Sequence, residues 1–277
     1  MTTAVLDPRS AAGHRAAEPG FPALLRSEWT KLTSLRSTWW SLTAVTVAAV
    51  GFTVLVTSVL TAQWSTLGAA TQTRFRSDTI GLILQPGAEW AQLAACVLGV
   101  LLTASEFSTG MIRSTVLATP SRTPVLAAKA VVLGGLLFVL AELVALPCYA
   151  IGSAITSAHA SVSLTDPTTL RALFCFGLYI ALSGVLALCV GALVRHSAGA
   201  VSLIVVLQFV LPNALGAIPG SLGAHITGAL PAGTSVMLGS GVDTDNVYSP
   251  LQGVLILLAW ASVLFLAARF SLKNRDV

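Results

Sequence analysis

Few side chains in this sequence could carry chemistry, and they form no recognisable catalytic or metal-binding motif. The four cysteines lie in apolar stretches without Cys-x-x-Cys or Cys/His ligand spacing, and the four histidines lie in separate segments. The sequence has no HExxH motif, no evident Ser/His/Asp set and no GxxxxGK[ST] phosphate loop. We therefore expect no enzyme activity, no metal site and no cofactor bound by this chain.

Glu142 is an unusual ionisable residue, because it lies near the centre of an apolar stretch over residues 130–152. A charged side chain at the centre of a bilayer costs about 2.5–3.5 kcal/mol on insertion scales. The carboxyl must therefore be protonated, be paired or face a protein interior. It is either a step for a proton, a cation or another substrate, or a protonated carboxyl hydrogen-bonded to a neighbouring helix.

A second set of polar residues lies in another apolar stretch, near residues 198–218. Gln208, Pro212 and Asn213 fall on or near one helical face there, next to Phe209. Polar groups in an apolar segment need partners, and the missing N–H of a proline tends to kink a helix. We predict that Gln208, Phe209, Pro212 and Asn213, with Gln92 from an earlier stretch, line a substrate pathway or a dimer interface.

The composition shows which elements must position these residues. Hydrophobic residues make up 55% of the 277 residues and charged residues only 9%, against about 25% in soluble domains. The 15 basic residues form no dense stripe, so the net charge of +4 does not indicate nucleic-acid binding. The sequence predicts an integral membrane protein in contact with lipids.

Six apolar segments are long enough to cross a bilayer, whose core of about 30 Å needs roughly 20 helical residues. They cover residues of about 39–60, 89–106, 130–152, 172–194, 198–218 and 251–268. Helices satisfy their own backbone hydrogen bonds in lipid. We expect an all-α membrane protein, with one six-span domain over residues 21–277 and a disordered lead-in over residues 1–20.

The basic residues predict the orientation of these spans. Twelve of them lie in the two termini and in the loops on the same side of the membrane, whereas three lie in the opposite loops. Because cytoplasmic loops carry an excess of Lys and Arg, both termini should be cytoplasmic.

Three shorter helical regions are predicted outside regular spans. Apolar residues from Phe21 to Trp39 recur at spacings of three and four, which indicates an amphipathic helix at the membrane surface. Between the second and third spans, Thr109 can cap a short helix that Pro120 stops. Glycines and prolines from Pro219 to Pro250 break apolar pieces, which is typical of re-entrant helices covered by protein. An ordinary loop is the alternative for the second and third regions.

The sequence resembles the permease subunits of ABC-2 type ABC transporters, in particular many from actinobacteria. The stretch over residues 25–40, LRSEWTKLTSLRSTWW, is similar to their N-terminal opening, and the tail SLKNRDV to their short basic ending. The order of five residues around the loop between the second and third spans is also similar: Glu106, Gly110, Pro120, Arg122 and Lys129.

The resemblance implies a subunit of an exporter in the bacterial plasma membrane, working as a dimer with a second copy or a paralogue. A separate ATP-binding cassette ATPase would bind ATP and Mg²⁺ and hydrolyse the ATP, and the substrate would be hydrophobic or amphipathic. The helix between the second and third spans would be the coupling helix. Its predicted ATPase-binding residues are Glu106, Gly110, Met111, Ile112, Arg113, Val116 and Arg122.

Two other functions remain open from the sequence. A proton-coupled secondary transporter would use Glu142 as its carrier, although no internal repeat with paired broken helices supports it. A membrane anchor of a signalling complex would transport nothing.

Overall fold

The computed structural model describes residues 20–108, 122–240 and 247–274, and these residues form helices and connecting turns without a strand. Six helices are long and apolar enough to cross a membrane, as expected for a multi-pass membrane protein: Arg36–Ala62, Thr79–Phe107, Thr123–Thr156, Pro167–Val194, Ser197–Gly216 and Pro250–Asn274. The number of apolar helices of membrane-spanning length thus agrees with the six predicted from the sequence.

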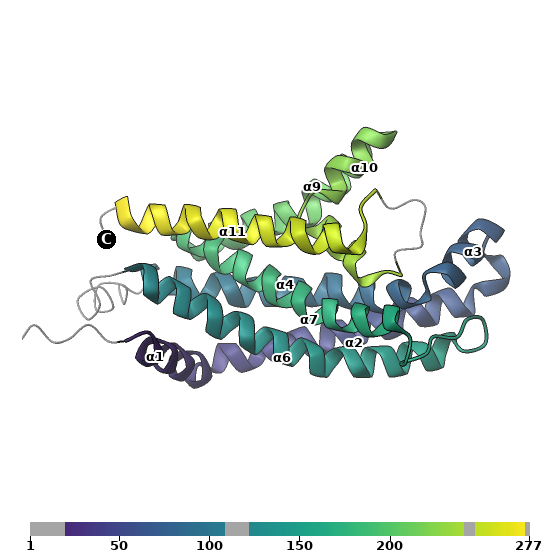
Figure 1. The fold of residues 1–277 in the computed structure, drawn as a ribbon, viewed down its shortest axis with the longest axis horizontal. Helices are drawn as coiled ribbons and strands as arrows, with labels where there is room; N and C mark the ends of the chain where they lie inside the picture. The colour runs from purple at the N-terminus through teal and green to yellow at the C-terminus, as the bar shows by residue number, and fades with distance from the viewer. Residues whose placement is uncertain (1–19, 109–121, 241–246, 275–277) are drawn as a thin grey trace, which may run out of the picture.

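The helices run in one bundle (Figure 1). In chain order they are α1 (Phe21–Ser34), α2 (Arg36–Ala62), η2 (Trp64–Thr66), α3 (Ala69–Ser77), α4 (Thr79–Ser108), α6 (Arg122–Thr156), α7 (Pro167–Val194), α8 (Ser197–Val205), η3 (Val206–Val210), α9 (Leu211–Gly216), α10 (Ser221–Gly228), η4 (Ala232–Leu238) and α11 (Pro250–Asn274).

Helix α7 is the centre of the bundle, because α4, α6 and α11 all pack against it. Helix α2 covers α4 and α6 from outside. Helices α4 and α7 approach each other closely at Gly99, where a Cβ atom would collide with the carbonyl oxygen of Gly184. One turn further along α4, the Thr103 hydroxyl donates a 2.9 Å hydrogen bond to the Leu188 carbonyl. Small residues and hydroxyl bonds of this kind hold helices together where lipid removes the hydrophobic driving force.

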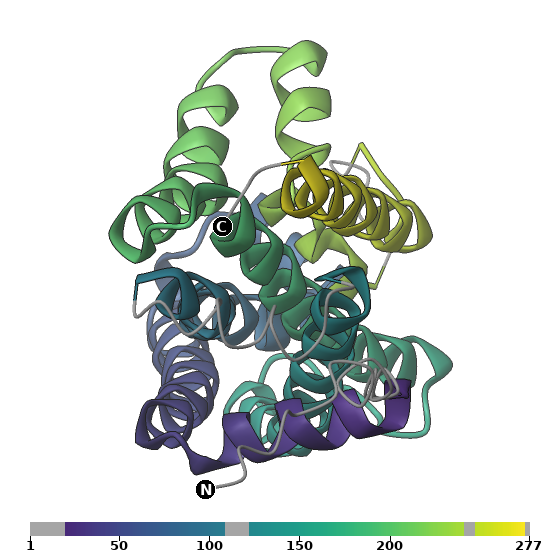
Figure 2. The same cartoon turned by 90° about the vertical axis from the view of Figure 1, so that its left-hand side faces the viewer.

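Helix α1 lies across one end of the bundle, beside the start of α2 and packed on α6 (Figures 1 and 2). The helix begins at Phe21, as the apolar spacing predicts, but it ends at Ser34 and not at Trp39, because Leu35 is extended and Arg36 already begins α2. The end of α11 lies at the same end of the bundle (Figure 1). The lead-in predicted over residues 1–20 falls almost wholly outside the described residues.

The second spanning helix is longer than its apolar stretch. Helix α4 begins at Thr79, ten residues before the expected start at Glu89, because the apolar side chains of Ile80, Ile83 and Leu84 extend its buried face. Pro86 lies inside this helix. The Thr53 hydroxyl of α2 donates a 3.1 Å bond to the Ile83 carbonyl, close to the point where the proline interrupts the backbone ladder.

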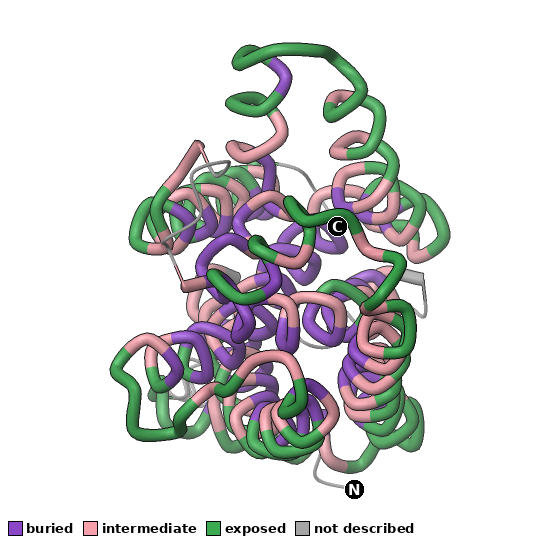
Figure 3. The backbone as a smooth tube through the Cα atoms, turned by 90° about the vertical axis from the view of Figure 1, so that its right-hand side faces the viewer, coloured by how far each residue is buried: buried purple, intermediate pink, exposed green. Residues whose placement is uncertain are grey.

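The fifth span is made of three consecutive pieces, α8, η3 and α9. The middle piece is a π turn, in which the Leu211 N–H donates to the Val206 carbonyl five residues back. It directly precedes Pro212, which has no N–H to continue the regular ladder. The chain then turns back through α10, which projects from the bundle and is largely exposed (Figures 2 and 3).

Candidate functional site

The residues predicted from the second and fifth spans meet around one cavity of about 280 Å³. All five of them line it, together with residues of α4, α10 and η4. The lining residues are Glu89, Gln92, Gln208, Phe209, Pro212, Asn213, Thr227, Ala232, Gly233 and Ser235. The convergence of Gln92 with the four fifth-span residues supports a shared role, while the choice between pathway and dimer interface stays a prediction.

Gln208 is a buried amide with unused hydrogen-bonding groups. Only 3% of the residue is exposed, and neither its Oε1 nor its Nε2 has a hydrogen-bond partner among the described residues. The Cys96 thiol lies beside it, but a thiol is a weak donor, and this one is directed at the Ser183 carbonyl, 3.4 Å away. An unpaired buried amide costs about 1–3 kcal/mol, so a group in the cavity that bonds to it would recover that loss.

Asn213 and the π turn form the part of the cavity wall that belongs to the fifth span. The Asn213 Nδ2 donates a 2.6 Å bond to the Phe209 carbonyl, which leaves its Oδ1 available as an acceptor. The turn places Gln208 inwards and Asn213 outwards, since the first is buried and the second exposed. The fifth span therefore presents amide groups at two depths of the same cavity.

Glu89 is the ionisable residue among the five lining residues that the sequence does not predict, because its charge resembles the boundary of the second span. It lies well inside α4, where a Cβ on neighbouring Gly87 would press on Ala49, near the middle of α2. Trp90 stacks on Phe52 of α2, with ring centroids 4.4 Å apart. These contacts put the Glu89 carboxyl at the depth of the middle of α2. The sequence does hold a signal for this residue: Gln85 and Glu89 are four positions apart, so two polar side chains lie on one face of the helix.

Aromatic rings continue the wall of the cavity towards α2. Phe209, which lines the cavity, lies against Trp90 with ring centroids 5.8 Å apart and planes tilted by 44°. Through Trp90 it connects with the Phe52 ring. The cavity lined by Glu89 and Phe209 therefore borders a row of three aromatic rings from α2, α4 and η3.

A buried polar group lies behind the cavity, between α4 and α7. Gln92 is 1% exposed, and its Oε1 accepts a 3.4 Å bond from the Ser183 hydroxyl. Tyr179 is completely buried beside Gln92, and its hydroxyl has no partner of hydrogen-bonding geometry among the described residues. The α4–α7 contact thus includes buried polar side chains at the level of the cavity.

Glu142 lies apart from this cavity. Its carboxyl packs against Gly177 of α7, where a Cβ atom would collide with it. Its buried Oε1 has no hydrogen-bond partner, and no bond from the carboxyl to another described residue is present. The interpretation as a carboxyl hydrogen-bonded to a neighbouring helix is therefore not supported, and Glu142 does not belong to the cavity lining.

A buried ion-pair cluster joins α1, the end of α4 and the first part of α6 at the α1 end of the bundle. The Lys129 Nζ lies 2.6 Å from Glu28 Oε2 and 2.6 Å from Glu106 Oε1. The Lys31 Nζ lies 2.7 Å from Glu28 Oε1 and 3.6 Å from Glu106 Oε1. The side chains of Glu28, Glu106 and Lys129 are each less than a tenth exposed. We call these four residues the ion-pair cluster; it carries two positive and two negative charges.

Lys31 shows the electrostatic effect of this cluster. Burial lowers the pKa of its ammonium group, but the hydrogen bonds and the attraction of Glu28 and Glu106 outweigh burial, so its pKa lies above the usual 10.5. Sequence reasoning identified Glu106 and Lys129 only through the family likeness. It placed Glu28 and Lys31 on the polar side of an amphipathic helix, without their partners.

The predicted coupling helix falls largely outside the described residues. Gly110, Met111, Ile112, Arg113 and Val116 all lie in the range 109–121. Of the predicted ATPase-binding residues, Arg122 begins α6, and Glu106 is buried in the ion-pair cluster.

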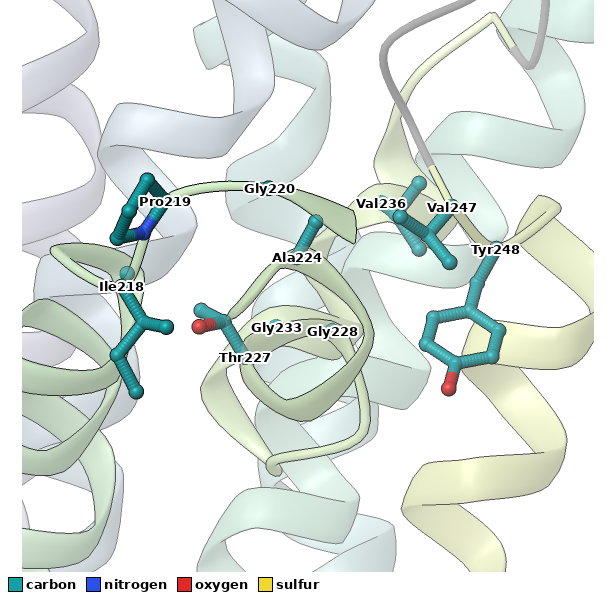
Figure 4. A pocket seen from close by; sticks show the side chains of 11 residues that line it. Ile218, Pro219, Gly220, Ala224, Thr227, Gly228, Gly233, Val236, Val247 and Tyr248 are labelled. Carbon is teal, nitrogen blue, oxygen red and sulfur yellow. The ribbon is translucent and has the colours of Figure 1, made fainter. Parts of the chain in front are cut away.

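A second cavity of about 470 Å³ lies beside α10. Figure 4 shows Ile218 on one side of α10, and Val247 and Tyr248 on the other. Thr227 and Gly233 line both cavities, so the two cavities adjoin at α10 and the start of η4. The Thr227 hydroxyl oxygen is buried without a partner among the described residues.

No group of three or more possible metal ligands occurs among the described residues. Comparison of the sequence with models of known protein families finds no match, and comparison with curated proteins finds none either.

Proposed function

We propose that the chain is the transmembrane permease subunit of an ATP-binding cassette exporter of the ABC-2 type. A separate ATPase subunit hydrolyses ATP, and the cavity beside α4 and η3 is part of the substrate path through the bacterial plasma membrane. In this proposal α1 lies at the cytoplasmic surface, and α10 with η4 forms the re-entrant region at the outer side.

The observation that carries this proposal is the ion-pair cluster. It joins α1 to the last turn of α4 and the second turn of α6, on either side of the segment predicted to dock on the ATPase. The cluster links the end of α4 with the first part of α6, the two helices that flank this segment, so a force on the segment would act on both of them. Its motion passes into α4, which carries Glu89 and Gln92 in the cavity wall. The cluster thus provides a rigid connection between the docking segment and the substrate path.

A second permease subunit completes the path in this proposal. Glu89 and Trp90 are exposed in the single chain, although they lie at the depth of the middle of α2. Hydrocarbon does not accommodate a carboxylate at that depth without a large penalty. A second copy or a paralogue facing this side of α4 would shield it. Because Gln208 points into its own bundle and Asn213 points outwards, Asn213 is the better position for cross-links between copies.

The proton-coupled alternative, with Glu142 as carrier, has less support, because Glu142 does not line the cavity. The anchor alternative does not account for a polar cavity at membrane depth.

The proposal is tested by assembly with an ATPase. We expect a gene for a cassette ATPase in the neighbouring reading frame; co-expression should give a complex that co-purifies in detergent and hydrolyses ATP. Ile112→Asp should release the ATPase or uncouple hydrolysis from transport, while the permease stays inserted. Ser163→Asp, in the exposed turn before α7 at the opposite end, is the control. Normal assembly and flux of Ile112→Asp would disprove the docking assignment.

A further inference from the structure

We propose that the cavity selects an organic cation, namely an ammonium group attached to an aromatic or apolar body, and that Glu89 determines this selectivity. The inference deepens the proposed function by naming its substrate class. It concerns the binding step, which can be measured without an ATPase.

The charge of the lining is the first argument. Among the ten lining residues, Glu89 is the one ionisable group, and none is basic. Glu89 forms no ion pair or hydrogen bond with another described residue, in contrast to Glu28 and Glu106, which both have lysine partners. A carboxylate at membrane depth needs a counter-charge. The chain does not supply one within the described residues, and a cationic ligand would.

The hydrogen-bonding groups of the lining are the second argument. An ammonium group donates up to three hydrogen bonds and accepts none. The cavity offers acceptors for them: the Glu89 carboxylate, the unpaired Oε1 of Gln208 and the Oδ1 of Asn213, whose Nδ2 is already engaged with the Phe209 carbonyl. Gln208 is suited to bind the ligand, because only 3% of the residue is exposed, its amide has no partner among the described residues, and it is part of the lining.

The aromatic wall is the third argument. Phe209 lines the cavity and lies against Trp90, which stacks on Phe52. Aromatic faces attract cations and also provide the apolar contact that a bulky organic body needs. A small divalent metal ion would require about six oxygen ligands, whereas the lining provides one carboxylate, and no metal-ligand group occurs among the described residues. The chemistry therefore favours an organic cation over a metal ion.

Three dansyl probes test the inference, because they share one aromatic body and differ in the head group. Dansylcadaverine carries an ammonium group at pH 7, its N-acetyl derivative is neutral, and dansylaminopentanoic acid is anionic. The full chain, purified into lipid nanodiscs, is titrated with each probe. We expect the cation to bind about ten- to a hundredfold more tightly than the neutral probe, the range expected for one charge-assisted interaction.

Variants assign this preference to particular residues. Glu89→Gln should remove the preference for the cation and leave the affinity for the neutral probe nearly unchanged, whereas Glu89→Asp should keep the preference. Glu142→Gln, which neutralises the carboxyl outside the cavity, is the matched control and should behave as the wild type. Phe209→Leu should weaken both the cationic and the neutral probe, because it removes an aromatic surface that serves both.

Several results would overturn the inference. Equal affinities for the cationic and neutral probes would contradict it, as would an unchanged preference in Glu89→Gln or the loss of that preference in Glu142→Gln. Cation selectivity without ATPase assembly would leave this inference standing and refute the exporter proposal. ATPase assembly without cation selectivity would leave the exporter proposal standing and refute this inference.

Discussion

Removal of the Lys129 ammonium group should destabilise the protein more than any other single loss of charge among its described lysines. In Lys129→Met, Glu28 and Glu106 lose the lysine that bridges them at 2.6 Å on each side. Breaking a buried ion pair by removing one partner costs about 3–5 kcal/mol. We expect the lower end, about 3 kcal/mol, because Lys31 still lies 2.7 Å from Glu28 and is partly exposed to water.

Thermal unfolding in detergent measures this effect through the four buried cysteines, which become reactive to a fluorescent maleimide when the bundle opens. At about 2–4 °C for each kcal/mol in a chain of this size, the midpoint should fall by about 6–12 °C. Adding Glu106→Gln to Lys129→Met should recover much of the loss, since Glu28 and Lys31 then remain as a balanced pair. Lys273→Met, on an exposed turn of α11, is the control. A loss in Lys129→Met no larger than in this control would refute the reasoning.

Three further predictions concern pH, packing and orientation. Because the pKa of Lys31 is raised above 10.5 in the folded protein, its stabilisation is fully present below about pH 10.5 and is lost as the pH rises through the higher folded value. The difference in unfolding midpoint between the wild type and Lys31→Gln should therefore be constant below about pH 10.5 and shrink above it. Gly99→Ala should destabilise the protein by about 1–3 kcal/mol in the same cysteine assay, because the added methyl group meets a carbonyl of α7. Gly51→Ala, where the added methyl group has open space, should be neutral or stabilising, and equal effects of the two variants would contradict the close approach of α4 and α7. A cysteine at Lys273 should react with an impermeant maleimide only from the cytoplasm and one at Asp166 only from outside, and the reverse pattern would overturn the orientation.

The spans and the cavity residues were predictable from the sequence because both depend on local pattern. Apolar length marks a membrane helix, and six helices of that kind are present. Gln208 and Asn213 stood out because amides in an apolar stretch need partners. These residues do line one cavity with Gln92.

The partners of charged residues were not predictable, because they depend on contacts between distant segments. Glu28 and Lys129 are separated by 101 positions, and only the packing of α1 on α6 brings their atoms within 2.6 Å. Glu89 resembles the end of a span, because hydropathy is averaged over a window of residues and a carboxylate lowers that average. The π turn before Pro212 is also not predictable, because a proline indicates that the backbone hydrogen bonds of the helix are interrupted but does not specify which irregular turn results.

The measurement that tests the central claim most directly is ATP-driven transport in inside-out membrane vesicles that contain this chain and its cassette ATPase. Uptake of dansylcadaverine and of its N-acetyl derivative is followed with and without ATP, and with the proton gradient collapsed by a protonophore. If the chain is the permease of an ATP-driven exporter, uptake requires ATP and both chains and persists with the protonophore. Uptake that follows the proton gradient without ATP, or that is unchanged when this chain is absent, would contradict the account.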